Sequence, residues 1–407
     1  MPKIDWNQVR DEAVRHLQAL IRIDTSNPPG YELPAAEYLA GVLAREGLSP
    51  QVLAATPARG SLVTRLRSSG ERPPLMLMAH LDVVPAVPEE WRHPPFAGVL
   101  ADGMVWGRGA IDCKDLVAAN LMVTLLCHRL GLLLRGDLVC LAHADEESTD
   151  FAHGIAWLAR HHRAIFDAPH ALYEGAGDEF ELAGRRVQTV AVAEKGWCTV
   201  ELTTRGQGGH SSRPHANNPL FHMAPILSRL QGQKMPVHIT RPAAEFFAGV
   251  AGLFNGDDPD TARLFRQMAD PATADAALER LPVSEAQRIW FDALIRNTAA
   301  PTMMRGSNSR DLDSPLYHSI RRVMGRRNPE VALVPVLMTG GTERGLLKEL
   351  GVQVYSFKPH RMQAGAPALW QLAHGVDERI SVDNLLYAVQ CIFDVVCDYN
   401  GIEVGFH

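Results

Sequence analysis

The 407-residue sequence contains no apolar run long enough to cross a membrane. A membrane-spanning helix needs about 20 consecutive apolar residues. The most apolar stretch, residues 116–134, is interrupted by Asn120, His128 and Arg129. Residues 1–10 are polar and of mixed charge, without the apolar segment of a signal peptide. We therefore expect a cytoplasmic protein with no membrane partner.

Cysteine is scarce, and basic residues are not in excess. The six cysteines include no Cys-x-x-Cys pair, which argues against a disulfide framework and predicts reduced thiols. The formal net charge is −6, and no basic stripe marks a nucleic-acid surface. With 46% hydrophobic and 21% charged residues, the composition is that of an ordinary globular protein. We expect no nucleic-acid partner.

Strand and helix patterns alternate along the first half of the chain. Apolar residues recur with helical spacing over 9–21, and residues 26–30 form a cluster that ends this helix. The same criteria predict helices at 35–45, 116–130 and 154–162, and strands at 61–67, 74–80, 137–144 and 171–174. Such alternation predicts a layered α/β domain.

The pattern changes near residue 194 and returns after 311. Residues 197–204 alternate like a strand, whereas 218–230 and 236–299 are mainly helical. The later part predicts helices at 316–324, 343–350 and 382–398, and strands at 331–337 and 352–357. A chain of this length usually forms more than one domain. We predict a catalytic domain in two parts, 1–193 and 312–407, interrupted by a second domain at 194–311.

Five short segments carry the acids and histidines that matter for chemistry. The first is His80-Leu81-Asp82, directly after an apolar strand. Because residues i and i+2 point the same way, Asp82 can accept a hydrogen bond from one ring nitrogen of His80 while the other faces a metal. The second, residues 107–114, is a glycine-rich turn whose Asp112 offers two oxygens for two cations. Taken singly, these segments also fit a surface turn and a helix cap.

The third segment, Asp145-Glu146-Glu147, follows a strand predicted to be buried. Three adjacent acids repel one another unless a cation compensates them. The carboxyl end of a strand is also where ligand sites of α/β sheets lie. A solvated loop is the alternative interpretation.

The fourth and fifth segments complete the set. Residues 173–178 contain Glu174 and Asp178, and residues 372–378 contain His374. In isolation they fit an acidic turn and a surface histidine. Together, the five segments supply imidazole and carboxylate ligands, which suit zinc first, with cobalt or manganese as alternatives. Two such ions about 3.5–4 Å apart can hold one bridging water, whose proton a metal-free carboxylate must accept.

The order and spacing of these segments resemble a known family. The resemblance rests on Thr25–Gly30, His80, Trp91, Pro95-Phe96, Asp102-Gly103, 106–110, 112–114 and Ile380-Ser381. The chain resembles the aminoacylase and carboxypeptidase family of co-catalytic di-zinc metallopeptidases. That family includes acetylornithine deacetylase, succinyl-diaminopimelate desuccinylase and yeast-type carboxypeptidase S.

The resemblance implies a fold and an activity. The fold would be a layered, zinc-peptidase-like α/β catalytic domain with an inserted, smaller α+β domain that serves as lid and dimerisation surface. The activity would be hydrolysis of an amide bond next to a free carboxylate, in small peptides or N-acyl amino acids, through a metal-bridging water. The partners would be a small-molecule or short-peptide substrate and a second copy of the chain.

The resemblance also implies metal ligands. His80 and Glu174 would hold one divalent ion, Glu147 and His374 would hold the other, and Asp112 would bridge both. Asp178 is the rival of Glu174, which matches the family's Glu-Gly motif. The peptide bond after Asp112 would be cis.

Further roles follow from the same resemblance. Glu146 would be the general base and later the proton donor to the leaving amine, and Asp82 would orient His80. His210, in the motif at 208–214, would stabilise the oxyanion, although a polar loop histidine is the alternative. The substrate would contact the loop Gly340-Gly341-Thr342.

The chain departs from the family in its second domain. After residues 301–306 it continues directly into 312–316, which resembles a later helix of the catalytic domain. The inserted domain is therefore predicted to be shortened, without an arginine that grips the substrate carboxylate, and Asn308 and Arg310 are the candidate substitutes. Asp115 also stands where a glycine is common. The alternative hypothesis is a catalytically weak or inactive metal-binding member of the family.

Overall fold

The computed structural model describes residues 4–148, 151–198, 204, 216–217, 219–231, 233–298, 305–306, 314–338, 347, 350–362 and 377–402. The chain forms two compact units. Unit 1 comprises Met1–Val192, Arg310–Val334 and Thr342–His407, and unit 2 comprises Ala193–Ser309 and Pro335–Gly341. Residues 335–341 thus group with unit 2, whereas the sequence analysis placed them in the catalytic domain.

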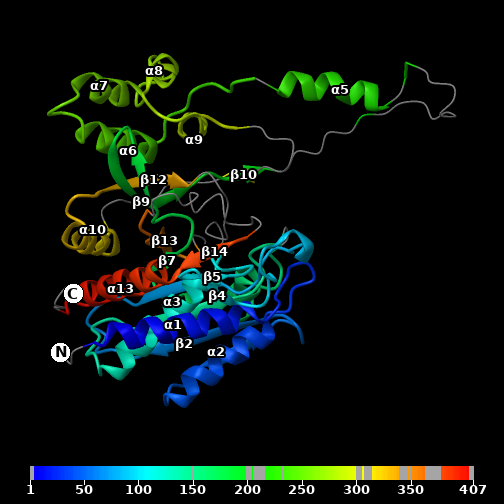
Figure 1. Ribbon diagram of the computed structural model, residues 1–407, viewed down its shortest axis with the longest axis vertical. Coiled ribbons are helices and arrows are strands. Elements are labelled where there is room, and N and C mark those ends of the chain that lie inside the picture. Colours follow the sequence, from blue (N-terminus) through cyan, green and yellow to red (C-terminus); the bar gives the residue numbers. More distant parts are fainter. Residues whose placement is uncertain are drawn as a thin grey trace. The chain divides into compact units, whose positions relative to one another are not determined.

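The core of unit 1 is a mixed sheet, of which Figure 1 labels the strands β2, β7, β9, β12 and β13. Its strands follow the order β1–β2–β6–β3–β7–β13–β9–β12, with β8 beside β9. The four central strands are parallel: β6 (Leu138–His143), β3 (Leu75–His80), β7 (His170–Tyr173) and β13 (Gln353–Ser356). The remaining strands are β1 (Gln51–Ala54), β2 (Gly60–Leu66), β8 (Glu179–Leu182), β9 (Arg185–Glu194) and β12 (Ala332–Met338).

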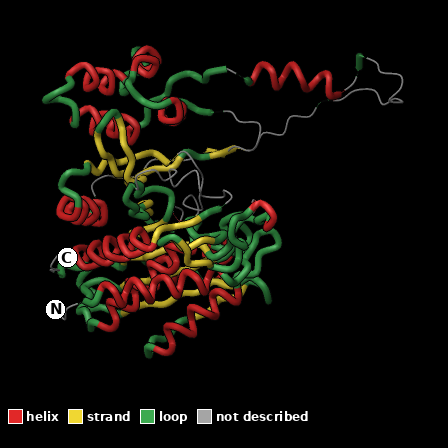
Figure 2. Tube along the Cα trace, in the orientation of Figure 1, coloured by secondary structure: helices red, strands yellow, loops and turns green. Residues whose placement is uncertain are grey.

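Helices cover both faces of this sheet, as Figure 2 shows for unit 1. One layer contains α1 (Trp6–Ile21), α2 (Leu33–Arg45), α3 (Lys114–Arg129), α10 (Pro315–Arg327) and α13 (Val382–Tyr399). The other contains α4 (Ile155–His161) and the 3-10 helix η2 (Arg163–Phe166). Alternate residues of β3 point to opposite faces of the sheet. Leu75 and Leu77 pack against the first helix layer, and Met76 and Met78 pack against the second. The predicted layered α/β architecture is confirmed.

A small antiparallel sheet lies beside this core. It pairs β4 (Val99–Ala101) with β5 (Met104–Trp106), and β5 with β14 (Arg379–Ser381). The 3-10 helix η1 (Pro88–Glu90) precedes it. Ser381 then begins α13, because its hydroxyl accepts a hydrogen bond from the Asn384 N–H. The late segment at 377–381 is thereby fixed beside the turn that carries Asp112.

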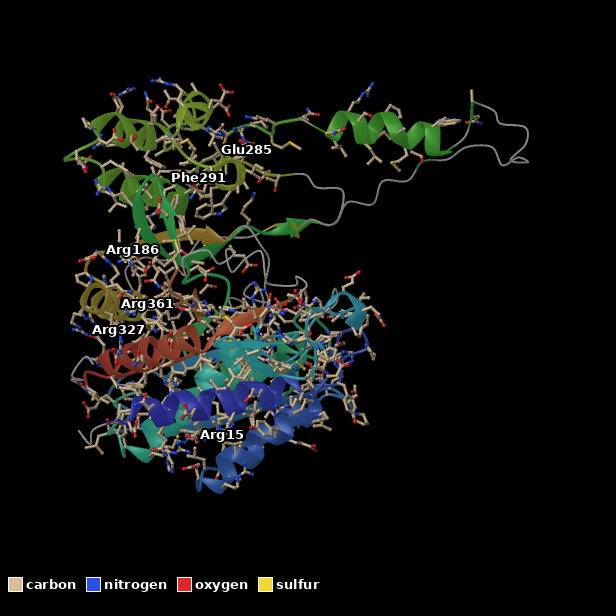
Figure 3. All side chains as sticks on the ribbon, in the orientation of Figure 1. Arg15, Arg186, Glu285, Phe291, Arg327 and Arg361 are labelled. Carbon is tan, nitrogen blue, oxygen red and sulfur yellow. The ribbon has the colours of Figure 1, made fainter. Side chains whose placement is uncertain are left out.

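Unit 2 is mainly helical in its described part. It contains α5 (Pro219–Leu230), α6 (Arg241–Gly252), α7 (Pro259–Gln267), α8 (Ala274–Arg280), α9 (Glu285–Ile295) and the strand pair β10 (Trp197–Cys198) and β11 (Arg305–Gly306). Four buried rings, Phe246, Phe247, Phe265 and Phe291, contact one another between these helices. Figure 3 labels Phe291 on α9. The predicted helical character of 218–230 and 236–299 is confirmed.

Most predicted elements of unit 1 are confirmed within one to three residues. The sequence analysis missed β1, β4, β5, β8 and β9, which are short or follow no clean apolar alternation. The predicted helix 343–350 and most of the predicted strand 197–204 lie outside the described residues. No helix in the described part of the chain is long and apolar enough to cross a membrane. The five cysteines with described side chains are free and buried.

Candidate metal centre

The carboxyl ends of the parallel strands bring the acidic segments of unit 1 together. His80 is the last residue of β3, Glu146 and Glu147 follow β6, and Glu174 follows β7. In the register, His80 pairs with His143, so the acids after β6 lie beside the residues after β3. Because parallel strands end at one edge of a sheet, these side chains converge there.

The ring of His80 is buried and held at both nitrogens. Its Nδ1 lies 2.9 Å from the main-chain carbonyl of Asp82. A carbonyl can only accept, so Nδ1 carries the proton of the neutral ring and Nε2 holds the lone pair. Nε2 lies 3.0 Å from Asp112 Oδ1 and 3.3 Å from Glu174 Oε1. A lone pair facing two carboxylates is an arrangement that a cation would stabilise.

Two groups of potential ligands share His80. One consists of His80, Asp112, Cys113 and Glu174, and the other of His80, Glu146 and Glu147. Within each group, one ligand atom from every residue lies within 4.8 Å of the others. Burial disfavours a charge on His80, but Cys113, Glu174 and Asp112 together raise the pKa of its ring well above the usual value. The cluster thus attracts positive charge, which a proton or a metal ion can supply.

Asp82 fixes the main chain of the two glutamates. Its carboxylate accepts the N–H of Glu146 at 3.0 Å and the N–H of Glu147 at 2.9 Å. The amide of Asn27 donates to the same carboxylate at 2.8 Å. Burial alone would raise the pKa of Asp82, but the nearby ring of His80 and the hydrogen bonds from Asn27 and Glu147 hold it below the usual value. Asp82 therefore positions the glutamates as well as the imidazole.

This geometry differs in one respect from the sequence analysis. There, the carboxylate of Asp82 was expected to accept the hydrogen bond from His80. In the structure the main-chain carbonyl of Asp82 is the nearest acceptor, and Asp82 Oδ1 lies 3.6 Å from Nδ1. The reason is that the carboxylate faces the two main-chain N–H groups after β6.

Asp145, the first of the three adjacent acids, has a protein cation as partner. Arg59 donates to Asp145 at 2.5 Å and to Glu32 at 2.6 and 2.8 Å, with all three side chains buried. The main-chain N–H of His153 donates to the other oxygen of Asp145 at 2.7 Å. Gly30 leaves room for the guanidinium, because a Cβ there would lie 2.2 Å from its central carbon. Asp145 is thus compensated without a metal ion.

The register of β2 and β6 explains this pairing. The two strands are antiparallel, with Leu62 opposite Ala142. Arg59, just before β2, therefore lies beside Asp145, just after β6. The three neighbouring acids therefore do not share one environment. Asp145 pairs with Arg59, which reduces its repulsion, whereas Glu146 and Glu147 belong to the His80 group.

The turn that carries Asp112 is held by Glu378. The carboxylate of Glu378 accepts the N–H of Ile111 at 2.8 Å and that of Asp112 at 2.9 Å. Arg108 compensates Glu378 at 2.7 Å, and its guanidinium stacks on Trp91. The Asp112–Cys113 peptide bond is cis, as predicted.

The two rival acids after β7 have different surroundings. Glu174 belongs to the His80 group, whereas Asp178 lies 3.3 Å from His360 Nδ1. Among the described residues, Glu174 is therefore the better-placed ligand. Seven other predicted site residues lie outside the described residues: His210, Asn308, Arg310, Gly340, Gly341, Thr342 and His374.

Several residues of the site were not identified from the sequence. Arg59, Glu32 and Lys358 stand in no local pattern that marks them. Strand pairing brings Arg59 and Lys358 to the site, and Glu32 joins it through Arg59. Glu378 and Asn27 lie inside segments that the sequence analysis quoted, so their proximity to the site could have been inferred. The hydrogen bonds that Glu378 and Asn27 form at the site could not be inferred from the sequence.

The chain was compared with known proteins. The family model described as peptidase family M20/M25/M40 matches residues 76–398. Over 394 residues the chain is 30% identical to a succinyl-diaminopimelate desuccinylase from Methylobacterium sp. (strain 4-46), covering 90% of this chain and 91% of the relative. Over 379 residues it is 26% identical to the human N-fatty-acyl-amino acid synthase/hydrolase PM20D1, covering 79% and 73%.

Solved structures show the same fold. Human carnosine dipeptidase 1 superposes with a TM-score of 0.66 at 15% identity, over 99% of this chain and 100% of that one. The Bacillus subtilis YXEP protein, described as a dinuclear metal binding peptidase, gives a TM-score of 0.51 at 12% identity, over 98% and 100%.

Proposed function

The chain belongs to peptidase family M20/M25/M40, and on that premise we propose that it is a two-metal amidohydrolase. The bond cleaved is an amide next to a free carboxylate, in an N-acyl amino acid or a small peptide. The metal ions, once bound, would supply an activated water as the attacking group. Zinc is the metal we propose, because imidazole and carboxylate ligands suit it best.

One observation carries the proposal. The Nδ1 proton of His80 is directed to the carbonyl of Asp82, and Asp112 and Glu174 approach Nε2 at 3.0 and 3.3 Å. A buried imidazole lone pair that faces two carboxylate oxygens is the donor set of a metal site. Glu146 and Glu147 approach the same imidazole from the neighbouring strand.

In this proposal His80 and Glu174 would hold one ion, Glu147 and His374 would hold the other, and Asp112 would serve both. Bound divalent ions would lower the pKa of a water and polarise the amide carbonyl. Glu146 accepts the proton of the attacking water and returns it to the leaving amine. Asp82 supports this step, because its carboxylate holds the main-chain N–H of Glu146 at 3.0 Å.

The family resemblance gives the remaining roles in our proposal. Residues 194–311 act as lid and dimerisation domain, His210 stabilises the oxyanion, and Asn308 with the Gly340-Gly341-Thr342 loop contacts the substrate. A hydrogen-bond donor aimed at an oxyanion is worth about 3–4 kcal/mol. The proposed site of action is the cytoplasm.

The relatives suggest the substrates to test. The names of two relatives describe hydrolysis of N-fatty-acyl amino acids and of succinyl-diaminopimelate, and a solved neighbour is a carnosine dipeptidase. Each of these substrates has an amide bond close to a carboxylate. A panel of N-acyl amino acids with short and long acyl chains, N-succinyl-diaminopimelate and dipeptides therefore covers the proposal.

The test combines metal analysis with this panel. The purified protein is expected to contain two divalent ions per chain and to hydrolyse at least one panel member, and a chelator should abolish turnover. Two bound ions without turnover would favour the inactive, metal-binding alternative. A protein that takes up no divalent ion would contradict both hypotheses.

A further inference from the structure

Behind the candidate ligands lies a second set of buried charges in unit 1. It consists of Lys358, Asp115 and His360, with the partly exposed Asp178 at its edge. Lys358 Nζ lies 3.5 Å from Asp115 Oδ1, His360 Nε2 lies 3.4 Å from Asp115 Oδ2, and His360 Nδ1 lies 3.3 Å from Asp178. The side chains of Lys358, Asp115 and His360 are almost fully buried, although burying such charges is costly.

Lys358 contacts the segments that carry two of the candidate ligands. Its Nζ donates to the carbonyl of Ile111, the residue before Asp112. Its main-chain N–H donates to the carbonyl of Ala176, two residues after Glu174, at 2.6 Å. A single residue therefore links the Asp112 turn to the Glu174 loop.

The main chain around Lys358 is fixed to the Glu174 loop. Phe357 N–H donates to Tyr173 at 2.8 Å, and the register of β13 and β7 places Ser356 beside Tyr173. Gly177 permits this close approach, because a Cβ there would lie 2.4 Å from the carbonyl group of Lys358. The position of the lysine is thus determined by the same strand pair that presents Glu174.

Charge supports the same arrangement. Burial alone would lower the pKa of Lys358, but Asp115, Asp112, Cys113 and Glu174 raise it above its usual value. Asp115 stands where the sequence analysis noted that a glycine is common in the family. The structure explains that departure, because Asp115 is the anion that pairs with Lys358 and His360.

We infer that Lys358 is a positioning residue of the metal centre, which links the Asp112 turn to the Glu174 loop and is held in place by Asp115. The inference rests on the proposed two-metal function. Two effects of removing Lys358 oppose each other. A lost positive charge would strengthen metal binding, whereas a lost link between two ligand segments would weaken it. The direct contact with Ile111 and the fixed main chain favour the second effect.

The test measures metal affinity of the metal-free protein by competition with a chromophoric chelator, using zinc as the probe. Lys358→Met keeps the apolar stem and removes the donor and the charge. It is expected to weaken zinc binding about 10- to 100-fold, the usual effect of removing a residue that supports a ligand. Lys358→Arg, which keeps donors and charge, should recover most of the affinity.

A second variant covers the case in which Lys358→Met does not fold. Asp115→Asn leaves the lysine present but removes its anion, and should weaken zinc binding by a smaller factor. The double variant should bind no more weakly than Lys358→Met alone, because both changes act on one unit. Additive losses would overturn the link between the two residues.

The matched control is Lys195→Met in unit 2. Lys195 also donates to two main-chain carbonyls, those of Ala293 and Arg296 at 2.9 and 3.0 Å. This variant should lower the melting temperature without changing zinc affinity. Zinc binding by Lys358→Met that equals or exceeds that of the unmodified protein would overturn the inference alone. Absence of zinc binding by the unmodified protein would instead overturn the proposed function.

Discussion

Two clusters of buried acids lie at the same edge of the sheet of unit 1, and they are compensated in different ways. In the arginine cluster, Asp145 and Glu32 contact the guanidinium of Arg59 at 2.5–2.8 Å. In the histidine cluster, Asp112 and Glu174 meet the lone-pair nitrogen of His80 at 3.0 and 3.3 Å. An arginine is always charged, whereas an imidazole is charged only when it binds a proton. The first cluster is complete as folded, and the second is suited to an added cation.

This difference distinguishes acids that stabilise the fold from acids that are suited to metal binding, even where both kinds follow the same strand. Asp145, Glu146 and Glu147 are consecutive, yet the arginine cluster contains the first and the histidine group contains the other two. We expect changes in the arginine cluster to cost stability, and changes in the histidine cluster to cost metal binding and turnover. The following predictions test that separation, from the largest expected effect to the smallest.

The largest effect is expected for Glu146→Gln in the histidine cluster. If Glu146 is the general base, kcat should fall about 10²- to 10⁴-fold while two metal ions remain bound. Glu147→Gln is the matched variant, and it should lose metal ions as well as turnover. Steady-state kinetics and metal analysis of both variants check the assignment. Near-normal turnover by Glu146→Gln would contradict the role of Glu146 as general base.

Arg59→Met should break the arginine cluster. It leaves Asp145 and Glu32 buried without their cation, and loss of one partner of a buried ion pair costs about 3–5 kcal/mol. Denaturant unfolding of the metal-free protein measures this loss. Arg67→Met is the control, since Arg67 is mostly exposed and pairs with Asp137 at 3.1 Å. Its loss should be below about 1 kcal/mol, and equal losses would contradict the comparison.

Removal of metal should affect the histidine cluster selectively. Free zinc at a concentration 100 times its dissociation constant would stabilise the folded protein by about 2.7 kcal/mol. The melting temperature should therefore fall when the metal is chelated, and Asp112→Asn should abolish most of this shift. The Arg59→Met variant, where it folds, should retain the shift. Calorimetry with and without zinc distinguishes these outcomes.

The smallest effect concerns an acid near the surface. Hydrogen bonds from Arg129, at 2.7 and 2.8 Å, together with the ring of His16 at 3.6 Å, lower the pKa of Glu12 to about 2. A lowered carboxyl pKa contributes stability above the ordinary value of 4.5, and this contribution is lost as pH falls toward about 2. In the metal-free protein, Glu12→Gln should reduce the change in the free energy of unfolding between pH 4.5 and about pH 2. The reduction should be less than about 1 kcal/mol. An unchanged profile would show that the pair contributes nothing.

Local patterns were sufficient to predict much of unit 1. The apolar run ending at His80 predicted β3, and the helical spacing over 9–21 predicted α1. The resemblance of the motif around Asp112 to the family implied the cis peptide bond that the structure contains. These features succeed because each depends on residues that are close together in the sequence.

Other features of the site depended on strand register. Taken by themselves, Asp145, Glu146 and Glu147 form one acidic segment, and in the sequence analysis only the family resemblance gave Glu146 and Glu147 separate roles. Arg59 reaches Asp145 only because β2 and β6 are antiparallel with Leu62 opposite Ala142. Lys358 reaches the Glu174 loop only because β13 is parallel to β7. A partner so distant along the chain leaves no local pattern.

The amino-acid sequence by itself determined the kinds of side chain available for metal binding and their order along the chain, because short motifs record both. Only the tertiary structure decided which acids pair with an arginine and which contact an imidazole. That decision follows from the fold, because strand pairing places Arg59 against Asp145 and the turn after β5 places Asp112 against His80, each within 3 Å.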